Sequence, residues 1–351
     1  MNNWTFTNLK TGTILFLFIL SFGAVYAQEY VPMLKPFYHG VASGDPLQDA
    51  VIIWTRVTPE YYMDQISVNW QMATDKEMTN VVASGNATTD TSMDYTVKVD
   101  VTGLDPGITY YYMFSALGGN SVVGKTKTTP SADPEAVKLA IVVCSNYQAG
   151  YFNAYRKISQ RNDLDAVLHL GDYFYEYGNG TYGTLLEERP LEPPHEVVSL
   201  EDYRTRYSHY RLDKDLRAVH QQLPFFAVWD DHESANDAWT DGAENHDTST
   251  EGDWEARKQR AKKVFYEWMP IRPEVQHGDP LYRSFNYGNL VDVIMLDTRL
   301  AGREEQIYPQ NDADTADWLA PDRTILGEDQ KNWLKDRSEE HTSELQSLLI
   351  I

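Results

Sequence analysis

The sequence is poor in cysteine and in basic residues. Cys144 is the one cysteine in 351 residues, so the chain can form no internal disulfide and has to be stabilised by packing. Lys and Arg together number 30 against 52 Asp and Glu, and the formal net charge is −22. Such an acidic surface repels nucleic acid and anionic membranes, so we expect neither as a partner. A polyanionic ligand would need local positive charge, such as bound metal ions.

A long apolar run of membrane-spanning length is also missing. The apolar stretch from residue 11 to 27 is short, follows Lys10 and ends in Val25-Tyr26-Ala27. We therefore interpret residues 1–27 as a Sec-type signal peptide and expect an exported protein, periplasmic or extracellular. No twin arginine precedes the run and no cysteine follows it at the cleavage site, which argues against twin-arginine export and a lipid anchor. We expect a monomer with no stable membrane anchor.

Residues 37–130 have the pattern of an all-β domain. The chain is 42% hydrophobic and 13% aromatic, as in a folded protein, and short alternating runs here are separated by Gly, Pro, Asn and Asp. The turn at Leu104–Gly107 leads into an aromatic run that ends in Tyr110-Tyr111-Tyr112, which resembles the tyrosine corner of a fibronectin-III-like sandwich. We favour a rigid packing module over a binding module, because no basic or aromatic patch is apparent.

Residues 138–336 follow a short linker and have the pattern of an α/β domain, in which strands alternate with helices. Expected strands cover residues 138–143, 165–170 and 224–229, and expected helices cover 152–160, 203–222 and 254–269. The segments 282–287 and 290–296 flank Gly288-Asn289 and predict a hairpin.

Four of these strands end in residues that bind metals. Cys144, Asp172, Asp231-His232 and Asp297 each follow an apolar strand, and Gly171 permits a sharp turn before Asp172. Ligands bind at the carboxyl ends of parallel strands, so we expect these residues on one rim. Asp172 suits a carboxylate that bridges two metals, Asp231 suits a terminal ligand, and His232 suits an acid that acts on substrate.

Two unusual donors narrow the choice of metal. Cys144 would bind as a thiolate, and the phenol of Tyr175 becomes a good ligand only beside a highly charged cation, so the set favours iron over magnesium. Taken alone, a cysteine at the end of an apolar strand is more often an inert core residue.

The motifs resemble a known family. Gly171-Asp172 with Tyr175 is similar to the Gly-Asp-x-x-Tyr motif of purple-acid-phosphatase-like metallophosphoesterases. Nearly everything from Phe37 to Asp336 resembles the PhoD-type alkaline phosphatases. The residues that carry this second resemblance are Phe37–Pro46, Cys144, Gly171–Glu176, Trp229–Glu233 and Leu296–Arg299.

The resemblance implies a four-layer α/β/β/α metallophosphoesterase domain after the fibronectin-III-like sandwich. It implies a secreted alkaline phosphatase that hydrolyses small phosphate mono- and diesters by attack of a metal-activated hydroxide, with Fe³⁺ and Ca²⁺ as cofactors. Cys144, Asp172 and Tyr175 would hold the iron, Asp172 and Asp231 would hold calcium, and His232 would stabilise or protonate the leaving group. The alternatives are a phosphodiesterase or phospholipase D-like enzyme on the same centre, a non-catalytic exported binding protein, and an inactive fragment.

The C-terminal end departs from the family pattern. Residues 337–347 match the translation of a common sequencing-library adapter, so we interpret 337–351 as an assembly artefact and expect the natural gene to continue past Asp336. The Gly-Asp-x-His block of the family is absent, so we expect the metallophosphoesterase domain to be incomplete. Arg299 could clamp a phosphate or form a salt bridge, while His246 and Asp247 are expected to be solvated in a polar loop.

Overall fold

A computed structural model describes residues 30–182, 186, 188–272, 281–340 and 347–350. The predicted signal peptide lies outside these residues. Within them, no helix has the length and apolar character needed to cross a membrane.

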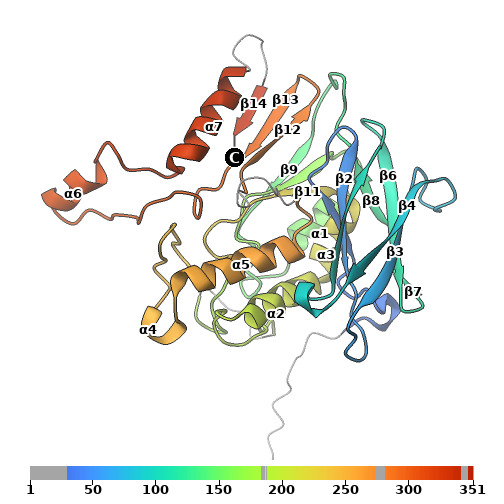
Figure 1. Ribbon diagram of the computed structural model, residues 1–351, viewed down its shortest axis with the longest axis horizontal. Helices are drawn as coiled ribbons and strands as arrows, with labels where there is room; N and C mark the ends of the chain where they lie inside the picture. Colours follow the sequence, from blue (N-terminus) through green and yellow to red (C-terminus); the bar gives the residue numbers. More distant parts are fainter. Residues whose placement is uncertain (1–29, 183–185, 187, 273–280, 341–346, 351) are drawn as a thin grey trace, which may run out of the picture.

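The N-terminal part is a sandwich of two sheets that enclose one apolar core (Figure 1). A short 3₁₀ turn, η1 (Pro32–Leu34), precedes it, and a second one, η2 (Thr91–Met93), lies between β4 and β5. The first sheet contains β1 (Val41–Gly44), β2 (Ala50–Arg56) and β5 (Thr96–Thr102). The second contains β3 (Ile66–Ala73), β4 (Val81–Thr89), β6 (Thr109–Ala116), β7 (Gly119–Asn120) and β8 (Gly124–Lys127).

The aromatic run of the sequence forms β6, and alternate side chains enter the sandwich core. Tyr110, Tyr112 and Phe114 are buried, whereas the residues between them are partly exposed. The hydroxyl of Tyr110 accepts a hydrogen bond from the backbone N–H of Asp105 at 2.8 Å. This bond ties the strand to the turn before it, which is the geometry expected of a tyrosine corner.

One sheet continues from the sandwich into the α/β part. The parallel strands β9 (Leu139–Val142), β10 (Ala166–His169) and β11 (Pro224–Ala227) pair in that order, and β11 pairs with β1 in parallel. The complete order is β5-β2-β1-β11-β10-β9. The two parts of the chain therefore share a backbone hydrogen-bond network, in which the sandwich supports one edge of the parallel strands.

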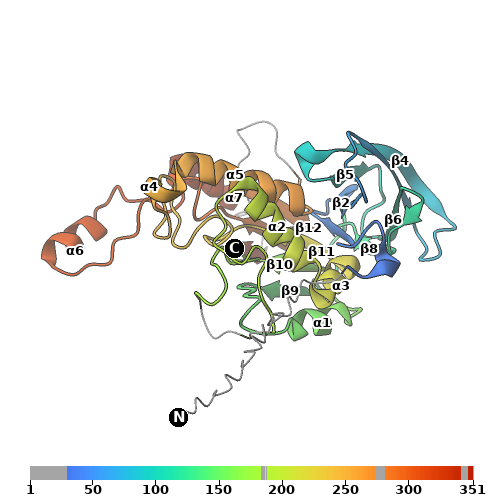
Figure 2. The same cartoon turned by 90° about the horizontal axis from the view of Figure 1, so that it is seen from below.

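Helices cover one face of β9–β11 and a second sheet covers the other. Side chains of β11 alternate between the two: Phe225 stacks on His220 with ring centroids 3.9 Å apart, while Phe226 packs on Phe285 at 4.4 Å. The helices beside the strands are α1 (Asn153–Ser159), α2 (Leu200–Arg211) and α3 (Lys214–Gln222) (Figure 2). The second sheet has the order β12 (Arg283–Tyr287), β13 (Val291–Met295) and β14 (Ser347–Ile350), and its first two strands form the predicted hairpin.

The helix predicted over residues 203–222 is two helices. Ser199 and Asp202 form the expected capping box at the start of α2. Helix α2 ends at Arg211, with Leu212 as its C-cap, and the carboxylate of Asp213 then accepts the N–H groups of Asp215 and Leu216 at the start of α3. The apolar spacing of four and three residues restarts two residues out of step at Leu212, and the prediction of a single helix overlooked this change of phase.

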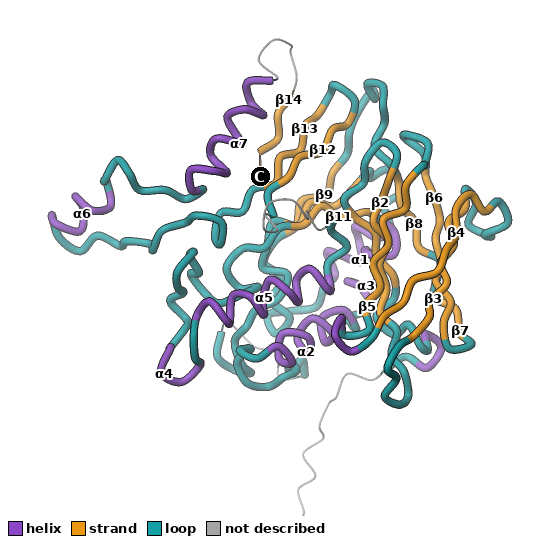
Figure 3. The backbone as a smooth tube through the Cα atoms, viewed as in Figure 1, coloured by secondary structure: helices purple, strands orange, loops and turns teal. Residues whose placement is uncertain are grey.

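Four further helices complete the described part of the chain, and the first long one, α5, packs Ala261, Val264 and Phe265 into the same core. They are α4 (Thr248–Glu251), α5 (Trp254–Trp268), α6 (Asp312–Trp318) and α7 (Gly327–Glu340). Figure 1 shows α6 in a long loop that projects from the body of the molecule, and α7 beside the second sheet. The rings of Tyr282 and of Trp333 in α7 lie 4.9 Å apart. The segment interpreted as an adapter begins within α7 and includes β14, and its artificial origin stays a prediction. Mainly loops follow β10 and β11 in the chain, and these loops carry the site described next. Figure 3 draws loops in teal, and many of them surround α2 and α4.

Candidate metal centre

The site lies at the carboxyl ends of the three parallel strands. Cys144 comes after β9, Asp172 after β10, and Asp231 and His232 after β11. Two backbone hydrogen bonds join the first two ends, from Cys144 N to Gly171 O at 3.3 Å and from Ser145 N to Asp172 O at 2.8 Å. The predicted gathering of these residues on one rim is therefore what the fold produces.

The backbone at these ends is held in the left-handed region. Gly171 has φ +105°, and a Cβ atom there would lie 2.3 Å from the amide nitrogen of Asp230. Glycine is required because the ends of β10 and β11 approach so closely. Cys144 and Asp172 also have positive φ, at 59° and 52°. Strained backbone of this kind persists where the surrounding structure imposes it, and it gathers at functional sites.

Asp172 belongs to two sets of donor atoms. Its Oδ2 accepts hydrogen bonds from the thiol of Cys144 at 3.3 Å and from the hydroxyl of Tyr175 at 3.1 Å. Single ligand atoms of Asp172, Asp231 and His232 also lie within 4.8 Å of one another. Asp172 Oδ1 is buried and has no hydrogen-bond partner among the described residues. A carboxylate shared by two donor sets is the arrangement a two-metal centre requires.

The pKa values of the candidate ligands indicate how a bound cation would change their protonation. Burial raises the pKa of Cys144 to about 11 and that of Asp231 to about 6, and it raises the pKa of Asp172 and of Tyr175 as well. Burial disfavours the anionic form of each group, whereas a bound cation favours it. The four groups therefore suit a cation that binds thiolate, phenolate and carboxylate together. Cys144 is exposed to solvent, so it is not a core residue, and its role as a ligand stays a prediction.

His232 is held by a buried glutamate that the sequence reading did not single out. Its Nδ1 lies 2.7 Å from Oε2 of Glu176, and both side chains are buried. Burial alone lowers the pKa of His232, but the hydrogen bond and charge of Glu176, with the charges of Asp172 and Asp231, raise it to about 9. Because Nδ1 is engaged by Glu176, Nε2 is the ring nitrogen left to contact another group.

Glu233 is a second residue that the sequence reading missed. Its carboxylate accepts the backbone N–H groups of Asp172 at 3.1 Å, Tyr173 at 2.6 Å and Asp230 at 2.9 Å. It therefore fixes the two ligand-bearing loops against each other. The signal was present in the sequence, since Glu176 and Glu233 both lie in the motifs that carry the family resemblance.

Two other residues, Asp297 and His246, differ from expectation, and Arg299 follows one of the two alternatives left open for it. Asp297 is not part of the metal-ligating group among the described residues, because it follows β13 of the other sheet and accepts the N–H groups of Arg299 and Leu300. Arg299 donates to Asp230 at 2.6 Å and lies 3.3 Å from Asp231, as in the salt-bridge alternative. The side chain of His246 is 2% exposed and contacts Glu251 at 3.0 Å, so its prediction as solvated was wrong.

Comparisons with known proteins agree with this architecture. Residues 139–348 match the family model of the PhoD-like phosphatases, and residues 25–130 match the model of the PhoD-like phosphatase N-terminal domain. Alkaline phosphatase D of Bacillus subtilis (strain 168) is 36% identical over 310 residues, which cover 85% of this chain and 53% of the relative. A solved structure of PhoD has a TM-score of 0.80 and 34% identity, over 90% of this chain and 62% of that one.

These matches confirm the predicted α/β metallophosphoesterase fold class. This chain spans 53% of the curated relative and 62% of the solved one, so both extend beyond it. The family model of the metallophosphoesterase part alone covers residues 139–348, more than half of the sequence. The chain belongs to the PhoD-like phosphatase family.

Proposed function

We propose that this chain contains the metal-binding part of a secreted phosphoric ester hydrolase that acts on small phosphate mono- and diesters. The observation that carries the proposal is Asp172, whose carboxylate is shared by two donor sets with His232 beside it. The membership of the PhoD-like phosphatase family and the identity to an alkaline phosphatase support the same chemistry.

We assign Fe³⁺ to Cys144, Asp172 and Tyr175, and Ca²⁺ to Asp172 and Asp231. A thiolate and a phenolate suit a trivalent iron ion, whereas a set that is rich in carboxylate oxygen suits calcium. When bound, these cations would neutralise charge on the phosphoryl oxygens and make the attacking water more acidic.

The chain's own residues supply the proton chemistry. Glu176 holds Nδ1 of His232, so Nε2 can deliver a proton to the leaving oxygen as the phosphoester bond breaks. Glu233 keeps the loops of Asp172 and Asp230 at a fixed separation, which sets the position of the bridging carboxylate.

The other parts of the chain have supporting roles in this proposal. We infer that residues 37–130 form a fibronectin-III-like packing module, since β1 extends the parallel sheet and Tyr110 makes a tyrosine-corner bond. Residues 1–27 would direct Sec-type export to the periplasm or beyond, and the acidic chain would act as a monomer on small-molecule esters rather than on nucleic acid.

Hydrolysis of nitrophenyl phosphate and of its bis ester tests the proposal. Asp172→Asn should lower turnover of the metal-loaded protein by at least about 100-fold, since the shared ligand is lost. Asp163→Asn is the matched control, because Asp163 is exposed and pairs with Arg161 away from the site. Wild-type turnover by Asp172→Asn would contradict the assignment. The ratio of the turnover rates on nitrophenyl phosphate and on its bis ester measures the preference between mono- and diesters.

A further inference from the structure

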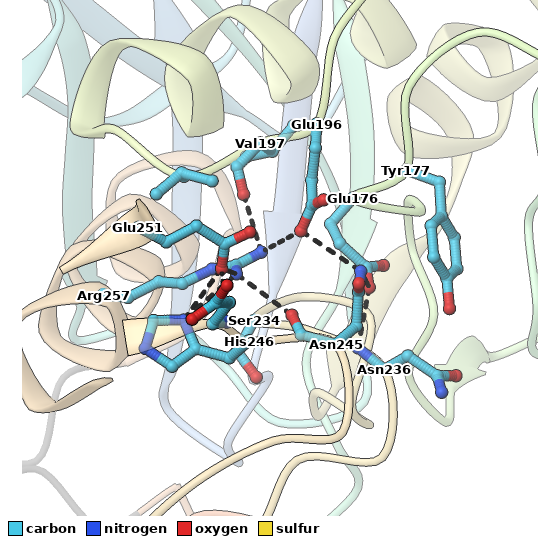
Figure 4. A network of polar contacts seen from close by, with 12 residues as sticks. Glu176, Tyr177, Glu196, Val197, Ser234, Asn236, Asn245, His246, Glu251 and Arg257 are labelled. Atoms are coloured by element: carbon cyan, nitrogen blue, oxygen red, sulfur yellow. Dashed lines mark hydrogen bonds and ion pairs between the residues drawn. The ribbon is translucent and has the colours of Figure 1, made fainter. Parts of the chain in front are cut away.

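A polar network lies behind Glu176 and reaches α5 (Figure 4). Oε2 of Glu176 faces His232, and Oε1 accepts two other hydrogen bonds. One comes from the side-chain amide of Asn245 at 2.8 Å, and the other comes from the backbone N–H of Asn236 at 2.7 Å. Among the described residues bonded to Oε1, Asn245 is thus the one that uses its side chain.

The amide of Asn245 holds two carboxylates at once. Its Nδ2 donates to Glu176 at 2.8 Å and to Oε1 of Glu196 at 3.1 Å. The two carboxylates are close enough for the charge of Glu176 to contribute to the raised pKa of Glu196, after burial as the main cause. Without the amide between them they would repel, and Glu176 would lose the contact that orients its carboxylate.

Arg257 anchors the far side of the network. Its guanidinium is fully buried and contacts Glu196 at 3.0 Å and Glu251 at 2.7 Å, and it donates to the backbone oxygens of Val197 at 2.9 Å and Asn245 at 3.1 Å. A buried arginine with several bonds of fixed geometry is a rigid support. Arg257 therefore holds Asn245 by the backbone and Glu196 by the side chain.

We propose that Asn245 is a positioning residue for His232 and acts through Glu176. Its amide, braced by Glu196 and Arg257, holds Oε1 of Glu176 so that Oε2 engages Nδ1 of His232 and Nε2 faces the site. The consequence for phosphoester cleavage rests on the proposed function, whereas the orientation of the imidazole does not.

The first test is the imidazole N–H proton of His232 in the iron-free 351-residue chain, because paramagnetic Fe³⁺ beside Asp172 would broaden the signal. A histidine N–H that is held by a buried carboxylate gives a far-downfield proton NMR signal, and His232→Phe identifies it by its loss. The signal should persist in the control Asp241→Asn, which changes an exposed residue earlier in the same loop, whereas in Asn245→Leu it should shift or broaden beyond detection. An unshifted, sharp signal in Asn245→Leu would overturn the proposal.

A second variant separates loss of the hydrogen bonds of Asn245 from misfolding. Asn245→Ser adds no bulk, and its short hydroxyl cannot reach both carboxylates, so the same loss of the signal is expected. Thermal unfolding of each variant shows whether the fold is retained.

The second test is a double-mutant cycle on phosphate ester hydrolysis. Asn245→Leu should lower kcat by about ten-fold on phenyl phosphate and by less on nitrophenyl phosphate, with KM unchanged, because a poor leaving group depends more on the proton from His232. In a Glu176→Gln background it should have no further effect. The proposal would be overturned if the reductions in kcat caused by Asn245→Leu and Glu176→Gln multiply in the double variant. It would also be overturned if Asn245→Leu lowers kcat equally for both esters. If the wild-type chain hydrolyses neither ester, the proposed function fails and the NMR signal alone decides the positioning role.

Discussion

Replacing Gly171 by alanine tests the close approach of the two ligand-bearing strand ends. An alanine there has to adopt φ +105° and place its Cβ 2.3 Å from the backbone nitrogen of Asp230. Gly103 is the matched control, because its φ is +75° and a Cβ there meets nothing within 4 Å. Gly103→Ala therefore measures the backbone effect alone, about 1–2 kcal/mol.

Gly171→Ala adds the overlap with Asp230, which we estimate at about 1–3 kcal/mol more from the effect of overpacking elsewhere. For a chain of 351 residues that difference corresponds to a melting temperature about 1–4 °C lower than that of Gly103→Ala. Thermal unfolding followed by circular dichroism measures both variants. Metal content after reconstitution should also fall in Gly171→Ala alone, since the loops of Asp172 and Asp230 must separate. Equal melting temperatures and equal metal content in the two variants would refute the reasoning.

Three further predictions concern single side chains. Tyr110→Phe removes the hydroxyl that accepts Asp105 N–H and should destabilise the chain by about 1 kcal/mol in urea unfolding, and an unchanged midpoint would count against a structural tyrosine corner. Burial lowers the pKa of His169 to about 3, so the unfolded chain takes up the proton first and stability is lost as pH falls below about 6.5. Between pH 7.5 and 5 the wild type should lose about 2 kcal/mol more than His169→Gln, and equal losses would contradict this. Tyr175→Phe should weaken iron binding by at least about ten-fold, measured by titration, and unchanged affinity would remove Tyr175 from the ligand set.

The position of the ligands could be predicted because it depends on local sequence. An aliphatic run followed by Gly171-Asp172 specifies both a buried strand and the turn that ends it, and parallel strands place such ends on one rim. Asp297 has the same local pattern, yet β13 belongs to the other sheet, so the pattern alone could not place it.

The features that could not be predicted from the sequence depend on contacts between distant segments. The pairing of β1 with β11 joins residues far apart in the sequence, and no local signal reports that one sheet crosses the predicted domain boundary. The roles of Glu176 and Asn245 likewise depend on how loops after different strands turn toward each other. Side-chain direction in loops has no periodicity from which it could be read.

Metal analysis of four matched chains tests the central claim, that Asp172 is shared by two donor sets. After reconstitution with iron and calcium, the wild type should hold both metals and Asp172→Asn should hold neither. Cys144→Ser should lose iron and keep calcium, and Asp231→Asn should lose calcium and keep iron. If Asp172→Asn keeps either metal at wild-type occupancy, Asp172 is not the bridge and the proposed centre is wrong.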